Sequence, residues 1–124
     1  MAVFDSQHVI IGLENTSQAL NENHHVGWFD GGCWTLLAAI VEVFPNDIQP
    51  YHISRTDTVP DHGVAYIPSC NVYFDADGLQ TKSQLFQKMR RTEGVNVQVI
   101  APLIQHQTIY EDIKQLLVLR FSGS

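Results

Sequence analysis

The sequence has few charged residues, few cysteines and little basic character. Only 16% of the 124 residues are charged, and 7 Lys and Arg residues stand against 13 Asp and Glu residues. Binding to duplex DNA or RNA requires a basic face that neutralises phosphates, so we expect no nucleic-acid partner. Two cysteines are too few for a small domain held together by disulfides. A hydrophobic content of 44% excludes a disordered acidic chain.

Long apolar runs are also missing. The longest, TLLAAIVEVF at 35–44, is far shorter than the ~20 residues that span a bilayer, and it contains Glu42. Asp5 and His8 interrupt the start of the chain, which has no basic segment leading into an apolar core, so no secretory signal is expected. We therefore expect a cytoplasmic protein with no membrane partner and with free thiols at Cys33 and Cys70. Signal-independent export into another cell stays open.

The order of the predicted elements indicates a single α+β domain over residues 1–124. A domain typically has ~100–150 residues, and no repeat or linker divides this chain. Thr81 with Gln84, and Thr108 with Glu111, have the spacing of helix capping boxes. Expected helices lie at 6–20, 34–44, 81–91 and 108–117, and expected strands at 48–54, 62–67, 72–75 and 95–100, with 62–75 forming a hairpin. The apolar content permits a dimer, but the sequence does not fix the oligomeric state.

The first residue that points to chemistry is Cys33. It follows Gly31 and Gly32 and opens the apolar segment 34–44, which predicts a helix buried in the middle of the domain. A helix N-terminus carries partial positive charge and free N–H groups, which favour the thiolate that acts as nucleophile. The two glycines leave space for a substrate backbone to approach. Cys33 is therefore the candidate nucleophile.

The hairpin supplies the other two candidate groups. The imidazole of His62 can take the thiol proton and later return it to a leaving group. A carboxylate on the facing strand would fix the ring, as in other nucleophile triads. A loop at Ser69–Cys70 sets His62 opposite Asp77, whereas a loop at Pro68–Ser69 sets it opposite Asp75. We favour Asp75, because it ends the apolar strand, and keep Asp77 as the alternative.

At these residues the chain resembles the papain-like and transglutaminase-like cysteine hydrolase and acyltransferase superfamily, in particular small phage- or plasmid-associated members. The resemblance covers about residues 24–78, in the stretches GWFDGGCWTLLAAI, DHGVAYI and NVYFDADG. It implies a central helix that bears Cys33 and packs on a small antiparallel sheet, with further C-terminal helices. It also implies that Cys33 is the nucleophile, His62 the base and acid, and Asp75 the orienting group. The expected substrates are proteins or peptides, cleaved or modified at peptide, isopeptide or side-chain amide bonds without a cofactor.

One position departs from the papain pattern. Papain-type enzymes place a glutamine several residues before the cysteine to build the oxyanion hole, and this chain has Gly27 and Trp28 there. Asn23, or the ring N–H of Trp28, can take that place. The expected substrate cleft comprises Trp28, Gly31, Gly32, His25 and Asn23.

Two other clusters have less specific interpretations. His24, His25, Asp30 and Cys33 are metal-ligand types, but adjacent histidines point apart on most backbones, so we expect no metal. Lys88, Arg90 and Arg91 on the helix 81–91 predict a solvated basic face. The alternative function is a non-catalytic binding or inhibitor module on the same scaffold, such as a phage- or toxin-associated protein. Small size, acidic charge and the missing glutamine suit that alternative.

Overall fold

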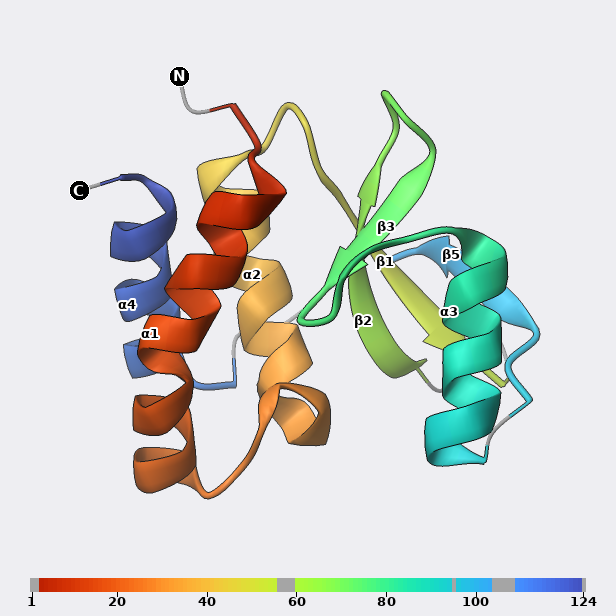
Figure 1. The fold of residues 1–124 in the computed structure, drawn as a ribbon, viewed down its shortest axis with the longest axis horizontal. Coiled ribbons are helices and arrows are strands. Elements are labelled where there is room, and N and C mark those ends of the chain that lie inside the picture. Colours follow the sequence, from red (N-terminus) through yellow and green to blue (C-terminus); the bar gives the residue numbers. More distant parts are fainter. Residues whose placement is uncertain (1–2, 56–59, 95, 104–108, 124) are drawn as a thin grey trace.

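A computed structural model describes residues 3–55, 60–94, 96–103 and 109–123. A five-stranded antiparallel sheet lies between two helical layers (Figure 1). Three helices cover one face, namely α1 (Ser6–His24), α2 (Cys33–Val43) and α4 (Glu111–Phe121), while α3 (Lys82–Lys88) covers the other. The predicted α+β class is confirmed.

The sheet has the strand order β4-β3-β2-β1-β5. Its strands are β1 (Gln49–Ser54), β2 (Pro60–Ile67), β3 (Val72–Asp75), β4 (Gly78–Gln80) and β5 (Val99–Pro102). The predicted hairpin is present as β2 and β3. The last strand begins later than expected, because the pairing of β5 with β1 starts at Val99, opposite Ser54. One backbone hydrogen bond precedes it among the described residues, from the Gln98 N–H to the Ser54 carbonyl.

Helix α1 runs further than the sequence predicts, to His24. Asp5 caps its start by accepting from the Gln7 N–H. Polar residues near its middle do not break it, because the buried Thr16 hydroxyl donates to the Gly12 carbonyl at 2.9 Å. The helix ends at His25, whose φ of 58° is left-handed. The helix is therefore four residues longer than the expected helix over 6–20.

An irregular turn, η1 (Trp28–Gly32), joins α1 to α2. Asp30 and Gly31 have non-helical backbone angles there, and the φ of 113° at Gly31 suits glycine. The chain bends by 81° between α1 and the segment Trp28–Val43. In the described ranges no single helix is long and apolar enough to cross a membrane, and only this bent pair taken together meets that criterion.

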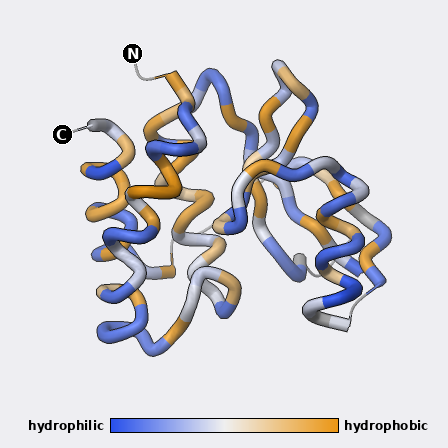
Figure 2. The backbone as a smooth tube through the Cα atoms, viewed as in Figure 1, coloured by the Kyte–Doolittle hydropathy of each residue, from blue (hydrophilic) through white to orange (hydrophobic). Residues whose placement is uncertain are grey.

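The main core lies between α1, α2, α4 and the sheet. Helix α2 is almost wholly apolar, and its residues Leu36 to Ile40 are buried. Hydrophobic and hydrophilic residues alternate along α1 and α4, as expected for helices with one buried side (Figure 2). Helix α2 approaches β2 closely at Gly63, where an added Cβ would lie 2.7 Å from the ring of Trp34. This contact brings the start of α2 next to the start of β2.

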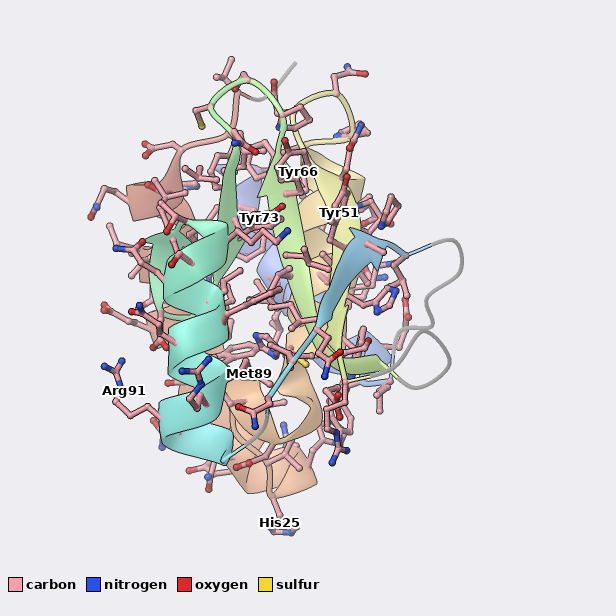
Figure 3. All side chains as sticks on the ribbon, turned by 90° about the vertical axis from the view of Figure 1, so that its right-hand side faces the viewer. His25, Tyr51, Tyr66, Tyr73, Met89 and Arg91 are labelled. Atoms are coloured by element: carbon pink, nitrogen blue, oxygen red, sulfur yellow. The ribbon has the colours of Figure 1, made fainter. Side chains whose placement is uncertain are left out.

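The opposite face of the sheet packs against α3. The predicted capping box of Thr81 and Gln84 opens this helix. Regular α-helix ends at Lys88, and a wider turn, η2 (Met89–Glu93), continues to Gly94. Tyr51, Tyr66 and Tyr73 gather on this face of the sheet (Figure 3). The second expected capping box cannot be placed, since Thr108 lies outside the described residues.

Candidate functional site

Cys33 is the first residue of α2, as the sequence predicts, and is 5% exposed. The two preceding glycines serve the turn itself. An added Cβ on Gly32 would lie 2.8 Å from both the Gly27 carbonyl oxygen and a methyl carbon of Leu20. Gly31 has the left-handed φ described above. The glycines therefore allow the tight turn that delivers Cys33 to the helix start.

His62 lies near the start of β2 and is 4% exposed. Its Nε2 is 3.1 Å from Oδ2 of Asp75, and the Cys33 thiol lies close enough to the ring to affect the pKa of His62. Since Nε2 is engaged with Asp75, Nδ1 is the ring nitrogen available to the sulfur. The imidazole thus bridges a thiol and a carboxylate, the order that nucleophilic catalysis by a thiol requires.

Electrostatics favour the charged form of this imidazole. Burial alone lowers the pKa of His62, but the hydrogen bond to Asp75 and the interaction with the Cys33 sulfur raise it from 6.5 to about 9. At neutral pH the ring is therefore held as imidazolium. An imidazolium beside a thiol stabilises the thiolate. The site therefore places a cationic imidazolium beside the Cys33 sulfur.

Asp75 reaches His62 diagonally across the hairpin. Ala65 pairs with Phe74 and Ile67 with Val72, the register in which His62 was expected to face Asp77. Strand β3 ends at Asp75, however, and the chain then turns into β4, which carries Asp77 away from β2. The hydrogen-bond partner of His62 is therefore Asp75, on the same face of the sheet.

Asp75 is 1% exposed and accepts bonds on both oxygens. His62 and the Lys88 ammonium meet Oδ2, while the Asp77 N–H (2.9 Å) and the Gln80 side-chain amide (2.7 Å) donate to Oδ1. Burial raises the pKa of Asp75, but the His62 hydrogen bond and the charge and hydrogen bond of Lys88 outweigh it, so the pKa lies below its usual value. Asp75 is thus a fixed, buried carboxylate.

Lys88 is the residue of this site that the sequence analysis missed. The prediction of a solvated basic face is wrong for Lys88, which is 9% exposed, although Arg90 and Arg91 are exposed. Figure 3 shows Arg91, in η2, pointing outward. The missed signal was helical spacing. Leu85, Lys88 and Met89 lie at i, i+3 and i+4 and share the buried side of the helix.

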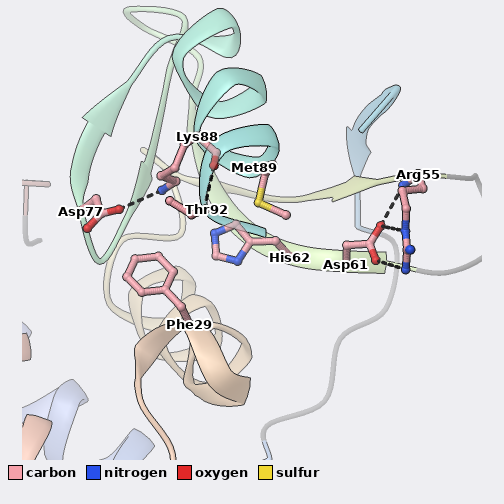
Figure 4. Close-up of a pocket in the computed structure, with 8 residues that line it drawn as sticks. All are labelled: Phe29, Arg55, Asp61, His62, Asp77, Lys88, Met89 and Thr92. Atoms are coloured by element: carbon pink, nitrogen blue, oxygen red, sulfur yellow. Dashed lines mark hydrogen bonds and ion pairs between the residues drawn. The ribbon is translucent and has the colours of Figure 1, made fainter. Parts of the chain in front are cut away.

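A pocket of about 390 Å³ opens beside His62 (Figure 4). The lining residues are Phe29, Arg55, Asp61, His62, Asp77, Lys88, Met89 and Thr92. The half-exposed ring of Phe29 stacks on His62 with centroids 5.7 Å apart. Cys33 is not among the described residues that line this pocket. Of the three groups, the imidazole is therefore the one that lines the pocket.

The cleft residues expected from sequence mostly lie elsewhere. Phe29 rather than its neighbour Trp28 forms the pocket wall, and Trp28 lines a separate hollow beside α1. Asn23 is exposed near the end of α1. His25 is exposed at the edge of the molecule, where Figure 3 shows it pointing outward. The turn η1 decides which aromatic side chain meets His62, and its irregular backbone cannot be read from residue types.

His24 and the cysteines have other surroundings. The Nε2 of His24 is 2.8 Å from Asp112, and its ring stacks on Tyr110, so it ties the end of α1 to the start of α4. Cys33 and Cys70 are both unpaired, one buried and one exposed. In the part of the chain that the structure describes, no three His, Cys, Asp or Glu side chains are grouped so that they could hold a metal ion.

The chain brings together a thiol, an imidazole and a carboxylate, with a lysine behind the carboxylate and a pocket beside the imidazole. Comparison with protein-family models, curated proteins and solved structures found no match to this chain. The geometry of these side chains is therefore the basis for assigning a function.

Proposed function

We propose that the chain is a thiol-dependent hydrolase or acyltransferase of the papain-like and transglutaminase-like type. It acts on peptide, isopeptide or side-chain amide bonds of a protein or peptide. The observation that carries this proposal is that the buried His62 ring interacts with two groups, the Cys33 thiol and the Asp75 carboxylate. Asp75 fixes the ring, and the ring polarises the thiol.

The reaction would proceed in two acyl transfers. The Cys33 thiolate attacks the carbonyl carbon, and the C–N bond breaks as His62 gives its proton to the leaving amine. This step leaves a thioester on Cys33. Neutral His62 then takes a proton from water or from an acceptor amine as that group attacks the thioester. The C–S bond of the thioester then breaks, which releases an acid or a new amide and returns Cys33 and His62 to their starting state.

The topology supports the papain-like assignment. A central apolar helix starts at Cys33 and packs on an antiparallel sheet, His62 stands near the start of one strand, and Asp75 ends the next. These are the placements that the sequence resemblance implies for nucleophile, base and orienting group. Helix α4, a further C-terminal helix, packs on the side of the sheet that carries α2.

Burial of the thiol favours a second candidate. Cys33 is 5% exposed, and a substrate carbonyl must come within about 3.5 Å of the sulfur before attack. A chain that never admits a substrate to Cys33 would serve as a binding or inhibitor module on the same scaffold. Reaching the thiol is therefore the point on which the two functions differ.

Alkylation by iodoacetamide tests the catalytic proposal. At about pH 6 an ordinary thiol is almost wholly protonated, so Cys33 should react at least about tenfold faster than the exposed Cys70. The variant Cys70→Ser isolates the reaction of Cys33, and Cys33→Ser isolates that of Cys70. In Cys70→Ser/His62→Ala the excess rate of Cys33 should vanish. Slow reaction of Cys33, equal to that of Cys70 and insensitive to His62, would contradict the proposal.

The variant Cys33→Ser separates the two candidates once a biological effect of the chain can be measured. A serine at this position keeps the shape of the site but removes the thiolate. Loss of the effect with retained folding supports catalysis through Cys33. An undiminished effect favours the binding module.

A further inference from the structure

We propose that Lys88 is a positioning residue of the candidate catalytic centre, which acts through its contact with Asp75. This inference rests on the proposed function and adds a fourth member to the three roles that the resemblance implies. Lys88 comes from α3, in a part of the chain that the resemblance does not cover.

The first argument is the burial of the lysine. An ammonium group removed from water is costly unless acids and hydrogen bonds compensate it. Lys88 has two such partners, because its Nζ bonds Oδ2 of Asp75 and lies 3.2 Å from Oδ2 of Asp77. Asp75 is 1% exposed, whereas the Asp77 side chain is 53% exposed. The buried half of this arrangement is therefore the Lys88–Asp75 pair.

The second argument is that Lys88 and His62 bind the same oxygen of Asp75. Oδ2 accepts from His62 on one side and from Lys88 on the other. Oδ1 is occupied by the Asp77 N–H and the Gln80 amide. The carboxylate cannot rotate without breaking several of these bonds. Lys88 thus helps to fix the atom that orients the imidazole.

A third argument comes from Phe29, which closes the arrangement into a ring of contacts. The Lys88 ammonium lies 5.1 Å from the centre of the Phe29 ring, and the same ring stacks on His62. A cation over an aromatic face is stabilised without a further charge. The contacts therefore run from His62 to Asp75, Lys88 and Phe29 and back to His62.

Charge balance shows what Lys88 would change. In the thiolate–imidazolium state the buried anions are Cys33 and Asp75, and the buried cations are His62 and Lys88. Asp77 adds a partly exposed negative charge. Arg55 and Asp61 also line the pocket, but they pair with each other at 3.0 Å. Without Lys88 the site carries excess negative charge, which disfavours a further anion at Cys33.

The test is the pH profile of Cys33 alkylation by iodoacetamide, measured in the Cys70→Ser background. Lys88→Met keeps the length of the side chain and removes its charge. The acid limb of the profile is the pH range in which the alkylation rate rises as the thiol ionises. We expect the midpoint of this limb to shift to higher pH by about one unit, so that the rate at a given pH on the limb is about tenfold lower. The rate at the alkaline plateau, where the thiol is fully ionised in either form, should be unchanged.

Two further variants serve as controls. Lys82→Met is the matched control, because Lys82 is an exposed lysine on the same helix, over the ring of Phe86. It should leave the profile unchanged. Lys88→Arg restores the charge and should restore the acid limb. A merely structural role of Lys88 would change the stability of the fold and the plateau rate but not the position of the limb.

Asp77→Asn tests the inference if Lys88→Met does not fold. It removes a partly exposed anion that shares Lys88, so the acid limb should move to lower pH, opposite to the effect of Lys88→Met. An unmoved limb in a folded Lys88→Met protein, or an upward shift in Asp77→Asn, overturns the inference. Either outcome leaves the proposed function standing, provided that the acid limb of Cys33 alkylation in the Cys70→Ser parent depends on His62. If the Cys70→Ser parent shows no acid limb that depends on His62, the proposed function itself is contradicted.

Discussion

The two faces of the sheet hold the fold together in different ways. The face toward α1, α2 and α4 is an apolar core in which Ala65 and Phe74 are buried. The face toward α3 carries the buried charged groups His62, Asp75 and Lys88 beside a smaller apolar cluster. Phe74 and Asp75 are neighbours on β3 and, because side chains alternate along a strand, they serve opposite faces.

The difference shows where stability and chemistry are separated. In the described part of the chain every buried side-chain nitrogen or oxygen has a hydrogen-bond partner. The charges on the α3 face are therefore compensated, yet an ionic group in the interior often contributes less stability than an apolar replacement. Their grouping on one face is the arrangement that the proposed function requires.

The largest expected effect is on stability, at Phe74. Phe74→Ala leaves a cavity in the apolar core and should lower the free energy of unfolding by about 3–5 kcal/mol, measured by urea denaturation. Protein that remains folded should keep the wild-type pH profile of Cys33 alkylation. Asp75→Asn, one residue away, should instead abolish the fast alkylation at about pH 6. Identical effects of the two substitutions on Cys33 reactivity would contradict the separation of the faces.

The next effect is a pH dependence of stability that comes from the α3 face. Because the pKa of His62 is raised in the folded state, protonation of this ring stabilises the fold fully below pH 6.5, and the contribution is lost as the pH rises through about 9. It amounts to about 3 kcal/mol. Urea unfolding at a series of pH values should show a decline over this window that is absent in His62→Gln. Parallel curves for the two proteins would speak against a protonated His62.

A smaller effect is expected where the two faces meet, at Gly63. An added methyl group would lie 2.7 Å from the Trp34 ring, so Gly63→Ala should cost about 1–3 kcal/mol of stability. It should also push α2 away from β2 and slow the alkylation of Cys33. Thermal unfolding and alkylation rates measure both effects. A stability change without a change in Cys33 reactivity would show that this contact does not position the thiol.

The smallest effect is expected at the rim of the pocket. The Arg55 side chain is 60% exposed and binds Asp61, so Arg55→Ala should cost only about 0.2–1 kcal/mol, and less at high salt. The alkylation profile of Cys33 should stay close to that of the parent protein. A stability loss comparable to that of Phe74→Ala would mean that the exposed rim is part of the core.

Sequence reasoning was most successful where local signals are strong. The start of α2 at Cys33 follows from glycines before an apolar run, and the hairpin follows from turn residues between two apolar strands. The exact partner of His62 depends on where β3 ends, and the favoured Asp75 was chosen because it ends that strand. The sequence left two registers open, and the one observed would set His62 directly opposite Asp77. Local residue types therefore indicated the elements better than the contacts between them.

The rest of the site depends on tertiary contacts that a single sequence does not encode locally. Lys88 looks like one of three solvated cations until its place on the buried side of α3 is known. The choice between Trp28 and Phe29 as pocket wall depends on an irregular turn with a left-handed glycine. The extension of α1 to His24 is reinforced by the contact of His24 with Asp112, which is far away in the sequence.

The measurement that tests the central claim most directly is an NMR titration of the His62 ring. If Cys33, His62 and Asp75 form one coupled site, the ring resonances should titrate with a pKa of about 9. The midpoint should fall in Cys33→Ala and in Asp75→Asn, because each removes a contact that favours the imidazolium. A midpoint at or below the ordinary value of 6.5, insensitive to both substitutions, would contradict the account.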